Sequence, residues 1–288
     1  MTPEYFIVLM FVLGLLVGSF LNVVIHRLPL IMEREWRAQC RLLFNDIVAS
    51  PDKASPATYN LIVPRSSCPH CHKQIHALDN IPVISYLLLR GKCRNCAAPI
   101  SLRYPVVELI SAGLAAFVAW HFNFEVKTFF AILLTWALLC LSVIDIDKQL
   151  LPDDITQPFL WLGLSCNLFN MFTDTNSSLI GAIAGYAILW IVFMLFKVIT
   201  GKEGMGNGDF KLLAMLGAWL GWQMLPFIIL FASLLGSLSG LFLIWIRRRD
   251  WGWGIPIPFG PYLALSGWIA LLWGSDVIRI YLSQFSQQ

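Results

Sequence analysis

The sequence predicts an all-α membrane protein that crosses the bilayer about eight times and carries one long polar insertion after its first helix. The chain of 288 residues is 58% hydrophobic and only 13% charged, and it holds 12 Trp and 20 Phe. This composition is typical of proteins with much lipid-facing and interfacial surface. The net charge of +3 comes from basic residues spread over several polar segments, which does not indicate a nucleic-acid-binding surface.

Eight apolar runs are long enough, or nearly long enough, to cross a bilayer as helices. The run 210–222 is short: as a helix it would be only ~20 Å long, so it requires a thinned bilayer or shielding by protein. The first run has no basic segment before it and no small-residue cleavage site after it, so we expect a retained anchor rather than a signal peptide. The eight runs lie at about residues 5–25, 105–123, 128–146, 156–172, 178–198, 210–222, 224–246 and 257–282.

Positively charged residues indicate how these helices are oriented. If the N-terminus lies outside the cytosol, the inward-facing segments are 26–104, 145–155, 197–211 and 247–256. Those four segments hold eighteen of the twenty Lys and Arg residues. We therefore expect the N-terminus outside and these segments in the cytosol.

Three regions follow from this arrangement. Residues 1–25 are the expected anchor, residues 26–104 are the candidate soluble region, and residues 105–288 are a core of seven helices. The middle region is polar, rich in turn residues and too short to bury a large hydrophobic core. It needs an additional cross-link to be stable.

Four cysteines in this region supply a cross-link. They occur as Cys68-Pro-His-Cys71 and Cys93-Arg-Asn-Cys96, two C-x2-C pairs separated by 21 residues. This pattern predicts a tetrahedral structural zinc site, although the separation is slightly longer than usual. The alternative is two disulfides, which the reducing cytosol disfavours. Cys40, Cys140 and Cys166 have no partner spacing, and we expect them to be small apolar side chains or unreactive thiols.

Two aspartates lie at the ends of predicted membrane helices. Asp145 closes the apolar run that begins at Phe129, and Asp209 follows the segment Gly204-Met-Gly-Asn-Gly. A carboxylate at the edge of the hydrocarbon costs about a few kcal/mol or more, so it is usually paired, lined by water or functional. In the expected topology both aspartates lie at cytosolic helix ends. The sequence therefore predicts a catalytic pair.

The acidic residues also have simpler interpretations. Asp209 by itself could be an N-cap for the helix that follows it. A dinucleotide site at the glycine-rich segment is excluded, because the segment lacks a preceding strand and an α/β unit. We expect Asp147, Asp153 and Asp154 to be solvated turn or cap residues. For Glu108 we expect a first-turn charge that the helix dipole favours.

Helix dipoles suggest how the two aspartates divide their roles. Asp209 begins a helix, where backbone N–H groups and the positive end of the dipole favour the charged carboxylate. Asp145 ends a helix, where the dipole and the preceding apolar run disfavour charge. We expect Asp209 to act as the ionised base and Asp145 as the protonated acid, unless Lys148 or Lys211 pairs strongly with one of them.

Five motifs resemble the type IV prepilin peptidases, the bacterial branch of the GxGD intramembrane aspartyl proteases. They occur in the family's order and cover nearly the whole chain. They are Gly18-Ser-Phe-Leu-Asn-Val-Val-Ile-His-Arg-Leu-Pro29, the two cysteine pairs, Asp145-Ile-Asp-Lys-Gln-Leu-Leu-Pro-Asp153, Gly206-Asn-Gly-Asp209-Phe-Lys-Leu and Ile257-Pro-Phe-Gly-Pro-Tyr262.

The resemblance implies an enzyme of the bacterial inner membrane with two activities. It would cut the basic leader from prepilins and pseudopilins, and then methylate the new N-terminal amine with S-adenosylmethionine. By position, Asp145 and Asp209 would be the catalytic pair. The residues themselves do not indicate where the methyl donor binds.

Two other functions are open. A transporter or channel could use an acidic gate and a zinc-stabilised cytosolic loop. Against it, both aspartates lie at helix ends rather than at the membrane midplane, and the chain shows no inverted repeat. A membrane assembly factor without catalytic activity is the other alternative.

Overall fold

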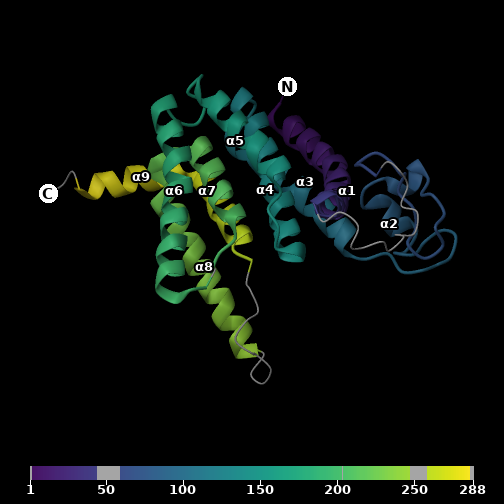
Figure 1. Ribbon diagram of the computed structural model, residues 1–288. Coiled ribbons are helices and arrows are strands. Elements are labelled where there is room, and N and C mark those ends of the chain that lie inside the picture. Colours follow the sequence, from purple (N-terminus) through teal and green to yellow (C-terminus); the bar gives the residue numbers. More distant parts are fainter. Residues whose placement is uncertain (1, 44–58, 203, 247–257, 286–288) are drawn as a thin grey trace. The chain divides into compact units, whose positions relative to one another are not determined.

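The computed structural model describes residues 2–43, 59–202, 204–246 and 258–285 (Figure 1). These residues form helices and connecting segments, with no strand among them. The chain divides into two compact units, residues 1–124 and residues 125–288.

The first unit is built on two antiparallel helices, α1 (Pro3–Leu43) and α3 (Arg103–Phe122). Their backbones approach closely, because an added Cβ at Gly14 would lie 2.6 Å from the Cα of Ala112. At Gly18 the corresponding distance to the Cα of Glu108 is 2.7 Å. The helix that begins in the expected anchor continues to Leu43, so residue 25 lies inside α1. Between α1 and α3 lie the short helices η1 (Ala77–Asn80) and α2 (Ile84–Leu88).

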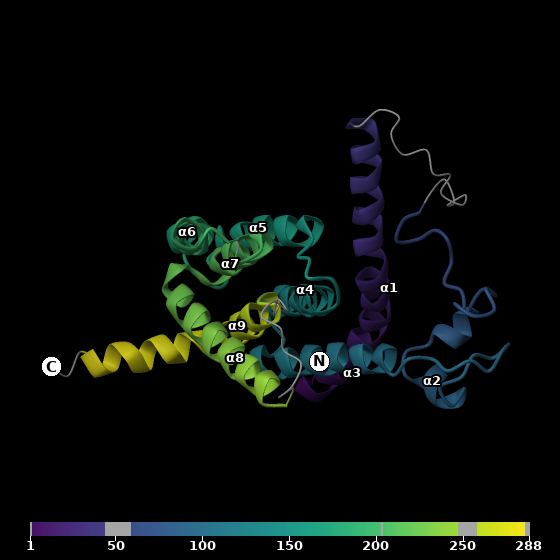
Figure 2. The same cartoon turned by 60° about the horizontal axis from the view of Figure 1, so that its bottom comes forward.

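The described residues of the second unit form six longer helices and one short one. Helix α7 lies against α5, α6 and α9, and α9 also packs against α4 and α8, as Figures 1 and 2 show. The helices are α4 (Val126–Lys148), α5 (Asp153–Asn167), α6 (Thr175–Thr200), α7 (Asn207–Leu220), η2 (Trp222–Met224), α8 (Leu225–Ile246) and α9 (Gly260–Phe285).

Helix α7 is the buried centre of this unit. It has only 14 residues, and every residue from Leu212 to Leu220 is buried. Its backbone touches α6, because an added Cβ at Gly185 would lie 2.6 Å from the carbonyl oxygen of Leu213. This burial among neighbouring helices agrees with the expectation that protein shields the short helix.

A buried asparagine fixes the ends of α5, α6 and α7. Asn167 is fully buried, and its Nδ2 donates to the carbonyl oxygens of Ala218 and Trp219 at 2.8 and 3.0 Å. Its Oδ1 accepts the backbone N–H groups of Phe172 and Thr173 at 3.0 and 3.2 Å. One amide therefore satisfies helix-end groups that would otherwise be buried without partners.

Each of the eight predicted apolar runs corresponds to one of the helices α1 and α3–α9. Five helical segments among the described residues are long and apolar enough to cross a membrane, which supports a multi-pass membrane protein. They are Pro3–Arg41, Arg103–Phe122, Val126–Lys148, Thr175–Thr200 and Trp222–Phe242. The all-α fold is confirmed for the described residues. The predicted inward segment 247–256 lies outside them.

Candidate aspartate site and cysteine cluster

Asp145 lies in the last turn of α4 and is buried, with 5% of its surface exposed. The helix ends at Lys148, because Gln149 adopts a left-handed conformation and donates its N–H to the carbonyl oxygen of Asp145. The Asp145 side chain accepts the backbone N–H of Gly260, with 3.0 Å between Oδ2 and the nitrogen. Its carboxylate therefore lies at the first residue of α9.

Asp209 is the third residue of α7 and has 7% of its surface exposed. The N-cap of this helix is Gly206, so the interpretation of Asp209 as the N-cap is wrong. From the third helical position, the Asp209 carboxylate accepts the backbone N–H of Gly206 instead. This contact resembles one half of a capping box, in which an acidic side chain reaches back to the start of its own helix.

The second unit brings the two aspartates into one site. The charge of Asp145 acts electrostatically on Asp209. Leu151 shows how close their supporting segments lie. An added Cβ at Gly208 would lie 2.7 Å from the Cβ of Leu151, and one at Gly260 would lie 3.2 Å from a methyl carbon of the same side chain.

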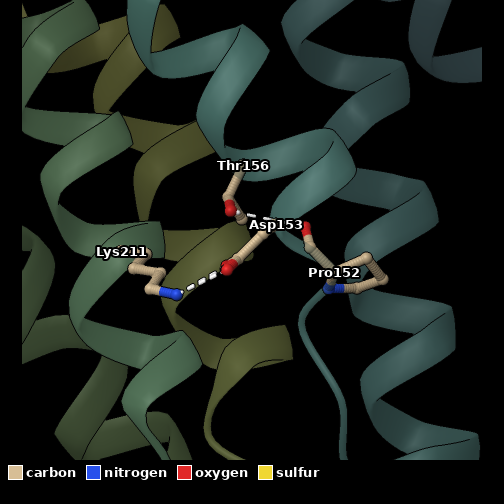
Figure 3. A network of polar contacts seen from close by, with 4 residues as sticks. All are labelled: Pro152, Asp153, Thr156 and Lys211. Carbon is tan, nitrogen blue, oxygen red and sulfur yellow. Dashed lines mark hydrogen bonds and ion pairs between the residues drawn. The ribbon is translucent and has the colours of Figure 1, made fainter. Parts of the chain in front are cut away.

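The remaining acids of this region lie on the surface. Asp147 and Asp154 are exposed. Figure 3 shows Asp153, the first residue of α5, reaching Lys211 on α7, with the Lys211 Nζ at 2.8 and 2.6 Å from its two carboxylate oxygens. Lys211 thus pairs with Asp153. The predicted roles of Asp145 and Asp209 depended on whether Lys211 pairs strongly with one of them.

The sequence reasoning did not identify Gly260 as a site residue. An added Cβ at this position would lie 2.6 Å from the Oδ2 of Asp145, closer than real Cβ atoms come, so the carboxylate occupies space that only glycine leaves open. Gly260 lies within the motif that ends at Tyr262, and the following Pro261 is typical of a helix start. Pro261 therefore predicts where α9 begins. It does not predict which group accepts the N–H of the first residue of α9.

The start of α9 also weakens the dipole argument. Asp145 lies at the negative end of α4 but also at the positive end of α9, and these two contributions oppose each other. Asp145 and Asp209 therefore each lie at a helix N-terminus and each accept one backbone N–H. The assignment of Asp209 as the base remains a prediction with less support than the sequence suggested.

In the first unit the four cysteines lie together. Their sulfur atoms are all within 4.8 Å of one another. The Sγ atoms of Cys68 and Cys96 are 3.8 Å apart, far longer than a disulfide bond of about 2.05 Å. Four sulfurs bonded to one zinc at about 2.3 Å in a tetrahedron would be about 3.8 Å apart. The donor set therefore fits a zinc ion.

The two cysteine pairs are built on the same backbone pattern. Cys68 donates its N–H to the carbonyl oxygen of Lys73, and Cys93 donates to that of Ala98, in each case five residues further on. Four residues after each of these cysteines, His72 and Ala97 adopt positive φ angles of 57° and 54°.

This pattern also favours the thiolate form of the first cysteine in each pair. Backbone N–H groups of Cys71 and His70 lower the pKa of Cys68 from its usual value to about 6. The N–H groups of Cys96 and Asn95 lower the pKa of Cys93 in the same way. A lower pKa favours the thiolate, which is the form of cysteine that binds a metal cation.

Comparison with known proteins relates these features to a family. The family model described as "Bacterial Peptidase A24 N-terminal domain" matches residues 12–122, and the one described as "Type IV leader peptidase family" matches residues 132–241. No solved structure matches the chain.

Curated relatives that carry the name "Prepilin leader peptidase/N-methyltransferase" match the chain over most of their length, and three are compared with it below. The chain is 53% identical to one from Stutzerimonas stutzeri over 99% of its own length and 96% of the relative. It is 54% identical to one from Pseudomonas aeruginosa over 97% and 94%. It is also 54% identical to one from Aeromonas hydrophila over 98% and 96%. The resemblance seen in the sequence is confirmed, and the chain belongs to the type IV leader peptidase family.

Proposed function

We propose that this chain is a membrane endopeptidase that removes the basic leader from type IV prepilins and pseudopilins. It then methylates the new N-terminal amine, for which S-adenosylmethionine supplies the methyl group. Relatives whose names carry both activities support this function. The transporter alternative has no comparable support.

The pair Asp145 and Asp209 carries the proposed peptidase activity. Both carboxylates are buried, and the charge of one acts on the other, so the pair favours a state in which the two share one proton. The ionised member takes a proton from a water molecule. The protonated member donates to the carbonyl oxygen of the bond to be cut, as in aspartic proteases generally.

Gly260 would keep this pair in position. Its N–H donates a hydrogen bond to the Oδ2 of Asp145, which fixes the orientation of the carboxylate. A carboxylate held by a helix start loses less freedom on binding substrate than a mobile one, and small displacements of catalytic groups cost large factors in rate. We therefore assign Gly260 a positioning role and keep the two aspartates as the catalytic groups.

We assign the cysteine cluster a structural zinc. Cys68, Cys71, Cys93 and Cys96 would fill all four positions of a tetrahedral shell, which leaves no position for a reactive water. The zinc would hold together a polar region that has little hydrophobic core of its own. This assignment supports the proposed division into an anchor (1–25), a zinc-binding insertion (26–104) and a protease core (105–288).

The proposed location is the bacterial inner membrane, with the N-terminus outside. The aspartate site and the cysteines would then face the cytosol. The distribution of Lys and Arg supports this orientation. Eight membrane helices remain our proposal, in which α5, α7 and α9 cross in addition to the five apolar segments named above.

The test is cleavage and methylation of a purified prepilin by the purified protein in lipid nanodiscs. Mass spectrometry should detect loss of the leader and, after addition of S-adenosylmethionine, one methyl group on the new N-terminus. Replacement of either Asp145 or Asp209 by Asn should abolish leader release. A wild-type protein that leaves the prepilin intact would contradict the proposed function.

A further inference from the structure

One buried carboxylate has no place in the mechanism above. Glu108 lies in the first unit, on α3, with 7% of its surface exposed. It is the sixth residue of the helix, so the expectation of a first-turn charge at the helix start is wrong. A carboxylate buried at this depth in a membrane helix is costly and usually pairs or serves a function.

The contacts of Glu108 come from neutral groups. Its Oε2 accepts the backbone N–H of Val83 at 2.8 Å, and the Ser19 hydroxyl of α1 donates to the same carboxylate. None of the ion pairs among the described residues includes Glu108. Its negative charge is therefore solvated by two dipoles and is not neutralised by a side-chain cation.

The segment that supplies the N–H adopts an unfavourable conformation to do so. Val83 has a φ of 58°, a left-handed value that β-branched residues rarely adopt. Its N–H points to a helix from which it is separated by 25 residues of sequence. Strained backbone of this kind is concentrated at functional sites.

Two other buried polar residues of the first unit, Asn22 and Arg27 on α1, donate to backbone carbonyls. The Asn22 Nδ2 donates to the carbonyl oxygen of Tyr104 at 3.1 Å. The Arg27 guanidinium donates to the carbonyl oxygens of Asn60 and Leu61 at 3.1 and 3.2 Å. These contacts tie α1 to Tyr104 and to residues 60–61.

We propose that Glu108 is the carboxylate of the methyl-transfer site and that its missing cation is the N-terminal ammonium of the cleaved pilin. This inference rests on the proposed function and names a residue for its second activity. An α-amine has an ordinary pKa of about 7.7–8.0, so it arrives largely as the ammonium and must lose a proton before it can react. A buried carboxylate both binds that ammonium and accepts its proton.

The methyl transfer begins with the loss of a proton from the ammonium. Glu108 takes one proton from the ammonium, and the freed lone pair attacks the methyl carbon bound to the sulfonium of S-adenosylmethionine. A C–N bond forms as the C–S bond breaks, and the electron pair of that bond stays on sulfur as a neutral thioether. The product is a methylated ammonium, and Glu108 passes its proton to water.

Three variants separate this role from simple anchoring of Val83. In Glu108→Gln the amide oxygen can still accept the Val83 N–H, but the charge is lost. In Glu108→Asp the charge remains, but the shorter side chain reaches less far. If Glu108 acts as a base, the methylation rate should be highest for the wild type, lower for Glu108→Asp and lowest for Glu108→Gln. If Glu108 only anchors Val83, Glu108→Gln should methylate as fast as the wild type and faster than Glu108→Asp. Glu33→Gln, an exposed position on α1, is the matched control.

The experiment supplies a pre-cleaved pilin peptide, so that methylation does not depend on cleavage. We expect Glu108→Gln to lower the methylation rate by ~10²–10⁴-fold, the range for loss of an acid–base group, while prepilin cleavage and metal content stay at wild-type levels. Methylation by Glu108→Gln at or above the rate of Glu108→Asp would overturn the proposal. A wild-type protein that cleaves but does not methylate would instead refute the proposed second activity.

Peptide binding gives a readout that is independent of turnover. Fluorescence anisotropy would compare a pilin peptide that has a free N-terminal amine with the same peptide acetylated. The wild type and Glu33→Gln should prefer the free amine, and Glu108→Gln should bind the two peptides equally. An unchanged preference in Glu108→Gln would also overturn the proposal.

Discussion

Asp145 in the second unit and Glu108 in the first are both buried carboxylates, and each accepts one backbone N–H from a distant segment. The donors are Gly260 at 3.0 Å and Val83 at 2.8 Å. Asp145 has a second carboxylate, Asp209, close enough for their charges to interact. Glu108 has only the Ser19 hydroxyl in addition. A carboxylate pair can share a proton, whereas a single carboxylate can bind a cation and accept a proton from it.

The backbone N–H groups that donate to Asp145 and Glu108 also belong to different kinds of element. Gly260 opens α9, a helix of 26 residues, so its N–H carries the positive end of a long helix. Val83 precedes α2, which has only five residues. The aspartate site is thus supported by a large, regular element, and Glu108 by a short and strained segment. We expect the first site to tolerate little change and the second to depend more on the cysteine cluster that bounds its loop.

The largest effect should come from removing one member of the carboxylate pair. Asp145→Asn or Asp209→Asn should lower prepilin cleavage by at least ~10²–10⁴-fold, because each removes an acid–base group. Both variants should still methylate a pre-cleaved peptide. Asp147→Asn is the control, since Asp147 is exposed and two residues from Asp145. Loss of cleavage in Asp147→Asn alone would show that the wrong member of the Asp-Ile-Asp sequence has been chosen.

A smaller effect should follow from disturbing the support of the pair. Gly260→Ala would place a Cβ 2.6 Å from the Asp145 Oδ2, so the carboxylate must move. A misplacement of about 1 Å can cost ~10²-fold in rate, and we expect a fall of that order in kcat with KM little changed. Gly236→Ala is the matched control, because its added Cβ would approach the Tyr262 and Phe259 rings no closer than 3.5 Å. Equal kinetics for the two variants would remove Gly260 from the site.

Metal analysis tests whether the cysteine cluster of the first unit holds a structural zinc. Protein purified under reducing conditions should contain about one zinc per chain, and Cys96→Ser should lower that content. Chelation should also make residues 59–102 more sensitive to protease, because the polar region has little other cross-linking. Cys40→Ser, an exposed cysteine on α1, should retain the metal. Protein without zinc, with the four cysteines oxidised in pairs, would favour the disulfide alternative.

The smallest effect should come from the ion pair that joins α5 to α7. Lys211 and Asp153 have side chains that are 29% and 55% exposed, so the pair is screened by solvent. Lys211→Met should lower the free energy of unfolding by only ~0.2–1 kcal/mol, seen as a small shift in thermal midpoint, and should leave cleavage nearly unchanged. A stable Lys211→Met protein without activity would mean that Lys211 acts on the aspartates rather than on Asp153.

The sequence by itself determined the elements of this protein. Each of the eight apolar runs forms one helix, because apolar length and polar punctuation are local properties that a linear sequence carries directly. The same holds for the cysteine pairs. Their C-x2-C spacing predicts clustered thiols, and the four sulfurs lie within 4.8 Å of one another. The end of α4 and the start of α7, which carry Asp145 and Asp209, were also visible in the sequence.

Only the tertiary structure decided how those elements surround the carboxylates. The donor to Asp145 lies 115 residues further along the chain, and no local pattern predicts such a contact. Sequence reasoning assigned Asp145 the dipole of its own helix and missed that of α9. It treated Glu108 as a first-turn charge favoured by the helix dipole and did not predict its burial, which depends on the packing of α1 against α3 at Gly18. Helix formation follows from neighbouring residues, whereas the electrostatics of a site depend on every segment that packs against it.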